Sequence, residues 1–342
     1  MSARTFRRGR PVLASAALVA LGSGALAASP AALPSPAAGL NILVVGIDSR
    51  QGVTPREKEK YRLGGKGCDC TDVMMLVHIS AKNDRVSVVS LPRDTLTGFP
   101  AGHRDQRTRA QHGAHQAKVN SARTEGGPAF TLETVERMTR TPVHRYLEID
   151  FRRFIDGVNR LEGGVPICTK VPLKDPVTGL DLPPGTKKAE GGEALQFVRS
   201  RRADGKLDFG RMQKQQQFVV NTLRKVRTEL TDPAALRTFA STLRGTARVE
   251  RGLSVTDLLT LATRLRNLTP SRTEFATVPV SGLKDVTGVG SAIAWNEKQA
   301  AEVFERLRAD KPLPKAATTP TSTVPQGLGE YRPIPGASLL CA

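Results

Sequence analysis

The sequence has few aromatic residues, and their scarcity limits the ligands that the protein can recognise. Phe, Tyr and Trp together make up 4% of the 342 residues, with one Trp. Proteins that bind single-stranded nucleic acids stack bases on aromatic side chains, and this chain offers little such surface. It also contains no helix-turn-helix pattern, zinc-finger ligand set or aromatic and basic RNA-binding motif. These absences argue against nucleic acid as a partner.

Acidic residues are also in the minority. The chain contains 32 Asp and Glu against 51 Lys and Arg, which gives a formal net charge of +19 at pH 7. A strongly basic surface attracts polyanions such as nucleic acid, anionic lipid headgroups, phosphate-rich polymers and phosphorylated ligands. Charge alone does not choose among them. With 39% hydrophobic residues, the chain can bury a sizeable core.

The N-terminal segment indicates export. The basic stretch "RTFRRGR" precedes the apolar, Ala-rich run "PVLASAALVALGSGALAA", which is the order typical of a signal sequence. Residues 1–28 are therefore predicted to be a signal peptide cleaved near Ala25–Ala27, or a single membrane-anchoring helix. A Pro/Ala linker follows at 29–40. The remaining chain is expected at the extracellular face of the cell membrane or in the cell wall, where nucleic acid is not the usual polyanion.

The spacing of the cysteines and histidines does not match a zinc finger. The cysteines are Cys68, Cys70, Cys168 and Cys341, and the five histidines do not complete a zinc-finger spacing with them. An even number of cysteines in an exported chain favours disulfides over metal binding. One possible pattern ties the Cys68/Cys70 loop to Cys168, and also to Cys341, but the sequence does not determine the connectivity.

Apolar runs and helical patterns alternate along the chain, which predicts an α/β sandwich. Expected strands cover 41–47, 72–80, 85–91, 143–149, 164–173 and 274–280. Expected helices cover 128–138, 151–161, 211–229, 233–244, 254–268 and 296–309. We predict one domain over 41–310 and a disordered tail over 311–342, where "PLPKAATTPTSTVPQ" is rich in Pro and Thr.

Polar clusters stand at the ends of these elements. Asp48 directly follows the first strand, "TD" at Asp72 opens the second, and "PRDT" with Arg93 and Asp94 follows the third. Ligand groups in α/β folds commonly lie at strand ends. Each cluster alone is also typical of a strand cap or turn, so the prediction of a site depends on their combination with the basic stretch described next.

The stretch "LQFVRSRRADGKLDFGRMQKQQQF" places charged residues between two expected helices. If the second helix starts near Phe209 with Asp208 as its N-cap, then Arg211 and Gln215 lie on one face, four residues apart. This puts a cation and an amide at the positive end of a helix, where phosphate is favoured. Arg202 and Asp204 are expected to be a solvated side chain and a loop residue.

Seven sequence segments of this chain resemble the LytR-CpsA-Psr family of bacterial cell-envelope proteins, and their residues resemble those of actinobacterial members. They are "NILVVGIDSR", "TDVMMLVHIS", "VVSLPRDT", "KVNSARTEGGPAFTLETVERMT", "DFRRFIDGVNRLEGGVPI", "GLDLPPGTKKAEGGEALQFVRSR" and "DFGRMQKQQQF". The resemblance runs from about 41 to about 226. It implies a mixed central sheet flanked by helices, an apolar pocket for a polyprenyl chain and a basic mouth for its phosphates.

The same resemblance implies an enzyme. Family members are understood to move a glycopolymer from a polyprenyl-pyrophosphate carrier to peptidoglycan at the membrane surface, leaving a phosphodiester bond. Mg2+, or Mn2+, assists. Arginine suits the phosphate-holding role because its guanidinium grips paired oxygens and stays charged. The alternatives are a polyprenyl-pyrophosphate-binding protein or pyrophosphatase without transfer, and a non-enzymatic envelope regulator.

The resemblance also assigns roles residue by residue. The residues expected to hold the pyrophosphate are Arg93, Arg199, Arg201 and Arg211, with Gln215 hydrogen-bonded to a phosphate oxygen. Asp48 and Asp72 match the metal-binding positions, and hard carboxylate oxygens suit Mg2+. Asp94 would orient Arg93 or take the proton of the acceptor hydroxyl. Asp208 would hold Arg211 in place.

This chain departs from the family pattern at Cys70, a position that is often Arg. Either one basic group is missing from the site, or a disulfide in the "CDC" loop shapes the rim that the arginine otherwise fills, with Lys66 as a weak substitute. The His- and Arg-rich stretch "FPAGHRDQRTRAQHGAHQAKVNSA" is predicted to be an exposed, mobile loop. The alternative is that it contacts an anionic polymer.

Overall fold

The computed structural model describes residues 39–65, 67–106, 108–229, 248–250, 261, 268–315 and 331–342. Within these residues, a seven-stranded sheet forms the centre of the fold, with the strand order β11-β6-β1-β2-β3-β12-β15. Its strands are β1 (Leu40–Ile47), β2 (Thr71–Ile79), β3 (Val86–Ser90), β6 (Arg145–Ile149), β11 (Arg248–Glu250), β12 (Thr273–Thr277) and β15 (Ile334–Pro335). The sheet is mixed, because β1 pairs antiparallel with β2 and parallel with β6. The predicted fold class is confirmed.

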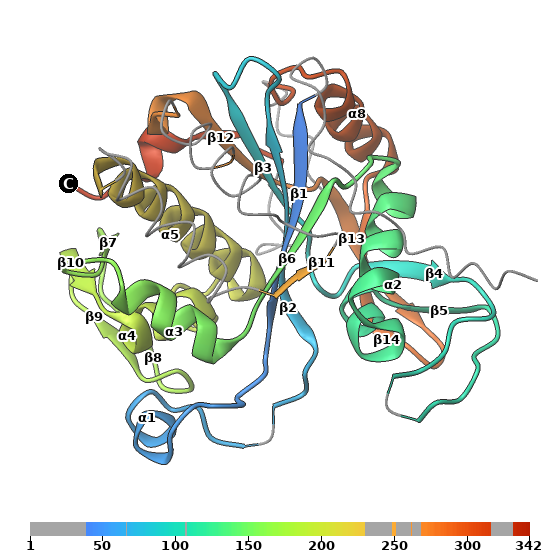
Figure 1. The fold of residues 1–342 in the computed structure, drawn as a ribbon, viewed down its shortest axis with the longest axis horizontal. Coiled ribbons are helices and arrows are strands. Elements are labelled where there is room, and N and C mark those ends of the chain that lie inside the picture. Colours follow the sequence, from blue (N-terminus) through green and yellow to red (C-terminus); the bar gives the residue numbers. More distant parts are fainter. Residues whose placement is uncertain are drawn as a thin grey trace, which may run out of the picture. The chain divides into compact units, whose positions relative to one another are not determined.

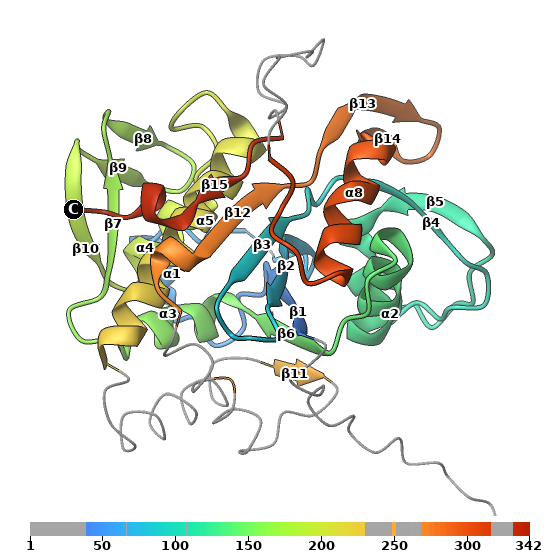
Figure 2. The same ribbon diagram turned by 90° about the horizontal axis from the view of Figure 1, so that it is seen from above.

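Helices cover both faces of this sheet (Figures 1 and 2). The described helices are α1 (Pro55–Lys60), α2 (Ala122–Thr139), α3 (Phe151–Asn159), α4 (Gly191–Arg199), α5 (Leu207–Glu229) and α8 (Glu297–Arg308), with 3-10 turns η1 (Val119–Ser121), η2 (Pro270–Arg272) and η3 (Gly336–Leu339). The smaller strands are β4 (Leu96–Phe99), β5 (His115–Lys118), β7 (Val165–Thr169), β8 (Leu173–Asp175), β9 (Leu180–Leu182), β10 (Gly185–Ala189), β13 (Val280–Val286) and β14 (Gly290–Trp295).

The alternation of side chains along β1 explains this arrangement. Leu43 and Val45 pack into an apolar cluster that includes residues of α2 and α8. Leu40 and Ile42 point to the opposite face and pack with Val220 of α5. Successive residues of a strand face opposite sides of the sheet, so a strand that is apolar throughout must be covered on both sides. A further apolar cluster joins α3, α4 and the strands β7 to β9 beside α5.

The C-terminal residues differ from the predicted disordered tail. Residues 331–342 are described, and β15 extends the sheet by pairing antiparallel with β12. Cys341 is buried, forms a disulfide with Cys168, and donates a hydrogen bond from its backbone N–H to Asn221 Oδ1 at 3.0 Å. The pairing of an edge strand and a disulfide hold this end of the chain. The prediction of disorder was based on the Pro- and Thr-rich residues that precede it, which carry no information on either contact.

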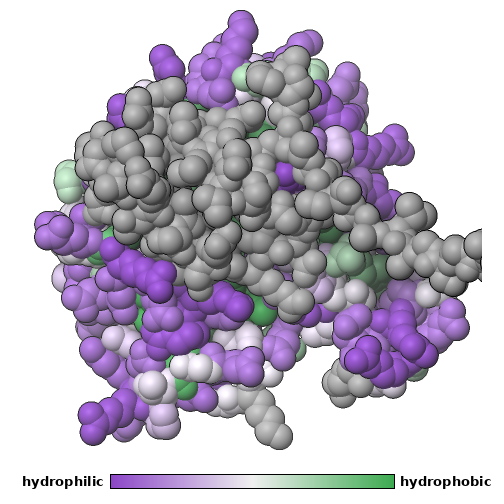
Figure 3. Space-filling view, viewed as in Figure 1, coloured by the Kyte–Doolittle hydropathy of each residue, from purple (hydrophilic) through white to green (hydrophobic). Residues whose placement is uncertain are grey.

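One further stretch differs from its prediction. The predicted mobile loop that begins at Phe99 contains β5, which pairs antiparallel with β4. Other predictions fall on residues that the structure does not describe: residues 1–38, Lys66, the predicted helix at 233–244 and most of that at 254–268. No helix in the described part combines the length and apolar character needed to cross a membrane. The described residues on the face shown in Figure 3 are mostly hydrophilic.

Candidate active site

Three strand ends meet at one edge of the central sheet, and each supplies predicted site residues. Because β2 runs antiparallel to both β1 and β3, its first residues lie beside the last residues of these two strands. Asp48 follows β1, Asp72 is the second residue of β2, and Arg93 lies three residues after β3. All three side chains line the same cavity. The sheet thus brings together residues that are up to 45 positions apart in the sequence.

A β-bulge sets the direction of the Asp72 side chain. Gly46 pairs with Val73 and Ile47 pairs with Thr71, so Asp72 is the extra residue between the two pairs. A bulge bends its strand and redirects the side chain of the unpaired residue. Here the redirected carboxylate meets the arginines that come from the helical side of the site.

The connection between α4 and α5 supplies these arginines. Arg199 is the last residue of α4, Arg201 lies in the connection, and Arg211 lies in α5. Asp175 of β8 fixes the backbone of this connection. Its Oδ2 accepts hydrogen bonds from the backbone N–H groups of Arg201 at 2.8 Å and Arg202 at 3.0 Å. Sequence reasoning missed Asp175, since nothing local distinguishes it from a turn residue.

The predicted N-cap of α5 is wrong. The helix begins at Leu207, and the Gly210 N–H donates to the Lys206 carbonyl oxygen at 3.2 Å, so helical hydrogen bonding starts before Asp208. Asp208 therefore lies inside the first turn, and its carboxylate contacts arginines instead of capping the helix. Arg211 and Gln215 nevertheless share a face, as predicted, because both are buried and both line the cavity.

Two carboxylates and three guanidinium groups form the centre of the site. Asp208 lies 3.0 Å from Arg201, 3.5 Å from Arg211 and 3.6 Å from Arg93. Asp72 lies 3.5 Å from Arg201 and 3.7 Å from Arg211, and accepts a hydrogen bond from Arg93. Each carboxylate is thus shared among three cations. The predicted partnership of Asp208 and Arg211 is part of this larger network.

The network changes the pKa values of its members. Burial acts to raise the pKa of Asp72, but the charges of Arg211, Arg93 and Arg201 outweigh it, and the pKa ends below its usual range. Burial lowers the pKa of Arg211 to about 10, against the opposing attraction of Asp208. At neutral pH these groups remain ionised, so the site presents guanidinium cations that are partly withdrawn from water.

Some of the buried guanidinium N–H groups lack hydrogen-bond partners. Among the described residues, Arg93 Nε, Arg199 Nη1 and Arg211 Nε are buried and make no hydrogen bond, although carboxylate oxygens of Asp94 and Asp208 lie 3.4 and 3.6 Å from Arg93 Nε. Arg199 packs its guanidinium over the ring of Phe151, 4.9 Å from the ring centre, and burial lowers its pKa. Leaving buried donors unpaired is costly, so these atoms are suited to an anionic ligand with several oxygens.

These cations lie in the wall of an apolar cavity of about 660 Å3. Most of the wall is hydrophobic and comes from the sheet, α3, α4 and α5. Its apolar members include Val44, Val73, Met75, Phe154, Leu161, Val198, Phe218 and Val219. The volume is within the range of small-molecule sites, about 300–1,000 Å3. An apolar cavity with cations in its wall suits an amphiphile with a hydrocarbon part and an anionic head.

Asp48 and Asp94 lie beside this central network with basic partners of their own. Asp48 forms a two-pronged ion pair with Arg50, at 2.9 and 3.0 Å. Asp94 lies 3.4 Å from Arg93 and 3.6 Å from Lys118. Arg50 and Lys118 were not singled out in the sequence, although "GIDSR" carries Arg50 within the first polar cluster.

Gln215 connects two helices in this structure. Its Nε2 donates to the Val198 carbonyl oxygen at 3.1 Å, near the end of α4. Its role toward a phosphate oxygen stays a prediction.

The disulfides pair differently from the pattern considered for the sequence. Cys68 pairs with Cys70, and Cys168 pairs with Cys341, so no disulfide joins the "CDC" loop to Cys168. The reason is spatial, because Cys341 reaches β7 through the C-terminal extension, with 5.6 Å between the Cα atoms of the pair. Cys68 lines the cavity. The departure from the family pattern therefore coincides with a disulfide-closed loop at the rim.

The chain belongs to the LytR_cpsA_psr family, whose model matches residues 25–309. It is 32% identical over 284 residues to "Probable cell wall biosynthesis protein LcpB" of Corynebacterium glutamicum, covering 82% of this chain and 64% of that protein. It is 26% identical to "Cell wall biosynthesis protein LcpA" of the same organism, covering 80% and 57%. The chain thus spans about 60% of the length of these two relatives. The family resemblance of the sequence blocks is confirmed.

Solved structures show the same fold. A protein of Streptococcus agalactiae, gbs0355, has a TM-score of 0.63 at 22% identity, with 82% of this chain and 91% of that chain covered. The structure described as "TagT bound to LIIa-WTA" has a TM-score of 0.58 at 23% identity, with 82% and 93% covered. The "LytR-Csp2A-Psr enzyme from Actinomyces oris" has 0.56 at 21%, with 81% and 92% covered.

Proposed function

We propose that this protein is a phosphotransferase that moves a glycopolymer from a polyprenyl-pyrophosphate carrier to peptidoglycan. The observation that carries the proposal is the set of unpaired, buried guanidinium N–H groups in the wall of an apolar cavity. Family membership supports it, and a further relative is named as a polyisoprenyl-teichoic acid–peptidoglycan teichoic acid transferase, 27% identical over 53% of this chain. The site of action is the extracellular face of the membrane or the cell wall.

In this proposal the prenyl chain occupies the apolar cavity and the pyrophosphate meets the arginines. Each methylene group buried there contributes about 0.8 kcal/mol. Arg199 and Arg211 then find the acceptor oxygens that their N–H groups lack, and each charged hydrogen bond adds about 1.5–3 kcal/mol where water is excluded. A phosphate oxygen also competes with Asp72 and Asp208 for the same guanidinium groups.

The reaction is an in-line displacement at phosphorus. An acceptor hydroxyl oxygen attacks the phosphorus that bears the glycopolymer, a new P–O bond forms, and the bond from that phosphorus to the bridging oxygen breaks. Polyprenyl phosphate leaves with the electron pair, and arginines stabilise the charge that spreads over the oxygens. Asp94 receives the hydroxyl proton in this scheme. It contacts Arg93 and Lys118, whereas Asp72 and Asp208 each contact three arginines, so its negative charge is less neutralised.

The carboxylates of Asp48 and Asp72 fit a divalent cation, Mg2+ or Mn2+. Both line the cavity and both offer hard oxygen donors, and Mg2+ typically takes one or two carboxylates together with phosphate oxygens and water. When bound, such an ion would neutralise phosphate charge. Arg50 donates to both carboxylate oxygens of Asp48, at 2.9 and 3.0 Å, and so orients the group.

The test uses the full chain with its disulfides formed, a synthetic polyprenyl-pyrophosphate oligosaccharide, peptidoglycan fragments and Mg2+. Mass spectrometry follows the products. We expect a sugar-phosphate adduct on peptidoglycan that disappears with a chelator, in Arg199→Ala and in Asp72→Asn, and that persists in Arg160→Ala, whose side chain is exposed and does not line the cavity. Hydrolysis without an adduct would identify a pyrophosphatase instead. Failure to bind or consume the lipid would leave an envelope regulator as the better description.

A further inference from the structure

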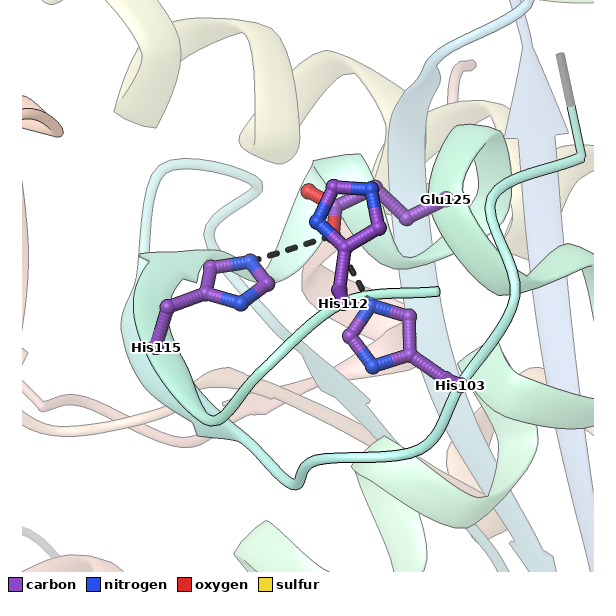
Figure 4. A group of neighbouring side chains, drawn as sticks. All are labelled: His103, His112, His115 and Glu125. Atoms are coloured by element: carbon purple, nitrogen blue, oxygen red, sulfur yellow. Dashed lines mark hydrogen bonds and ion pairs between the residues drawn. The ribbon is translucent and has the colours of Figure 1, made fainter. Parts of the chain in front are cut away.

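A second cluster of chemically reactive side chains lies away from the cavity, at the far end of the β4–β5 hairpin. Its members are His103, His112, His115 and Glu125, and none of them lines the cavity (Figure 4). The Gly102 N–H donates to the His112 carbonyl oxygen at 2.9 Å, and the His112 N–H donates to the His103 carbonyl oxygen at 3.1 Å. The two arms of the connection thus run side by side. This backbone pairing brings together histidines that are nine residues apart.

The first turns of α2 supply the fourth member. Gln106 N–H donates to the Glu125 carbonyl oxygen at 2.8 Å, which ties the connection to α2. The Glu125 side chain then reaches the rings, and its Oε2 lies 3.1 Å from both His103 Nε2 and His115 Nε2. One nitrogen or oxygen atom from each of the four residues lies within 4.8 Å of the others.

This spacing is close to that of a metal's ligand shell. Zinc bonds of about 2.0–2.1 Å in a tetrahedral arrangement place the ligand atoms about 3.3 Å apart. The two distances from Glu125 Oε2 are already near this value. A nitrogen of His112, whose ring is about one-third exposed and also lies 3.8 Å from Asp105, is within 4.8 Å of the other three ligand atoms.

Hydrogen bonds at the outer side of two rings determine which nitrogen carries the hydrogen when the ring is neutral. His103 Nδ1 lies 2.9 Å from the Pro100 carbonyl oxygen, and His115 Nδ1 lies 3.0 Å from the Gly113 carbonyl oxygen. A carbonyl oxygen only accepts, so both Nδ1 atoms carry hydrogen, and in a neutral imidazole Nε2 is then a bare acceptor. In the neutral form both Nε2 lone pairs face the Glu125 carboxylate, which is also an acceptor. Protons on the rings or a metal ion between these atoms resolve this conflict, and a backbone partner on the other ring nitrogen is typical of metal-binding histidines.

We propose that His103, His112, His115 and Glu125 form a structural Zn2+ site. Three imidazole nitrogens and one carboxylate suit Zn2+, whereas Mg2+ and Ca2+ prefer oxygen ligands throughout. Four protein ligands leave no open position, which is typical of structural rather than catalytic zinc. All four cysteines are in disulfides, so no thiolate competes for the ion.

The surroundings suit such a role. The His103 side chain is 6% exposed and stacks on the ring of Phe130 with 4.4 Å between ring centres, whereas His115 is 33% exposed and leaves a route for the ion. Zinc would hold the outer end of the hairpin to α2. The inner end of β5 carries Lys118, which contacts Asp94 at 3.6 Å. The inference does not depend on the proposed transferase activity.

The test uses the full chain without a polyhistidine tag, with disulfides formed, treated with a chelator and then dialysed. Isothermal titration with ZnCl2 and elemental analysis after gel filtration give affinity and stoichiometry, both in excess Mg2+. We expect one zinc per chain and a higher melting temperature. Glu125→Gln and His112→Asn should weaken binding by more than the roughly 10- to 100-fold lost with an outer-shell partner. Glu133→Gln, an exposed position of the same helix, should bind as the wild type does.

Two results would overturn the proposal. One is a wild-type chain that retains no zinc at equimolar metal. The other is equal zinc affinity in Glu125→Gln, His112→Asn and Glu133→Gln. Since His112 is partly exposed, its replacement should leave the chain folded, which circular dichroism checks before titration. Zinc that remains bound in Asp48→Asn would show that the ion does not occupy the candidate active site.

Discussion

The loop that carries Arg201 should depend on a single carboxylate, Asp175, and this can be measured by unfolding. Asp175 is 2% exposed. Its Oδ2 accepts from the N–H groups of Arg201 and Arg202, and its Oδ1 accepts from those of Val177 at 2.9 Å and Thr178 at 3.3 Å. An Asn side chain has one accepting oxygen, which can serve two of these four donors. In Asp175→Asn the amide NH2 therefore faces the other two donors.

The expected loss follows from the pKa. Burial acts to raise the pKa of Asp175, but the backbone N–H groups of Arg202, Arg201, Val177 and Thr178 lower it from 3.8 to about 2. This shift corresponds to about 2 kcal/mol of stability at neutral pH. Unpaired buried donors add further cost, about 1–3 kcal/mol. We therefore expect Asp175→Asn to reduce the free energy of unfolding by about 2–4 kcal/mol.

The assay is urea unfolding at pH 7 with disulfides intact, with Asp181→Asn as the matched control. Asp181 lies on the paired strand β9, is 67% exposed and contacts Lys174 at 3.4 Å, so its replacement should change stability by less than about 0.5 kcal/mol. The carboxylate of Asp175 has a lowered pKa in the folded state. Its contribution is present above the ordinary pKa of about 4 and is lost as the pH falls toward about 2.

Two outcomes would refute this reasoning. One is an Asp175→Asn variant that unfolds at the same urea concentration as Asp181→Asn. The other is a stability difference between wild type and Asp175→Asn that stays the same from pH 7 down to pH 2.5. If Asp175→Asn also binds the polyprenyl-pyrophosphate donor more weakly, the hydrogen bond from Asp175 to the Arg201 backbone contributes to the position of the Arg201 side chain in the site.

Three further predictions concern the cavity, its cations and the C-terminus. Arg211→Lys should lower affinity for a polyprenyl pyrophosphate about 10- to 100-fold in a fluorescence binding assay, because Lys lacks the planar fork, whereas Arg160→Lys, at an exposed position outside the cavity, should change it less than about twofold; equal effects would remove Arg211 from the site. Leu161→Glu puts a carboxylate in the apolar wall and should reduce lipid binding more than tenfold, with pyrophosphate alone binding unchanged; unaltered lipid binding would place the prenyl chain elsewhere. Replacing Cys168 and Cys341 together by Ala should cost about 2–5 kcal/mol in urea unfolding, because the disulfide links residues 173 positions apart; a loss below about 0.5 kcal/mol would contradict this.

Much of the fold and part of the site could be predicted from local patterns. The apolar runs at 41–47, 72–80 and 85–91 became β1, β2 and β3, because strands covered on both faces must be apolar throughout. The positions of Asp48, Asp72 and Arg93 at strand ends were visible for the same reason. Arg211 and Gln215 share a face of α5, because a spacing of four residues matches the helical repeat.

The tertiary structure alone decided which distant groups meet. The bulge that turns Asp72 toward the arginines depends on the pairing of β1 with β2, and the support of Arg201 by Asp175 spans 26 residues. The pairing of Cys168 with Cys341 and the convergence of three histidines on Glu125 also depend on how the chain folds back on itself. Periodicity in the sequence reports which face of an element is buried. It carries no information on the distance between side chains on different elements, and that distance determines which ion pairs, disulfides and metal ligands form.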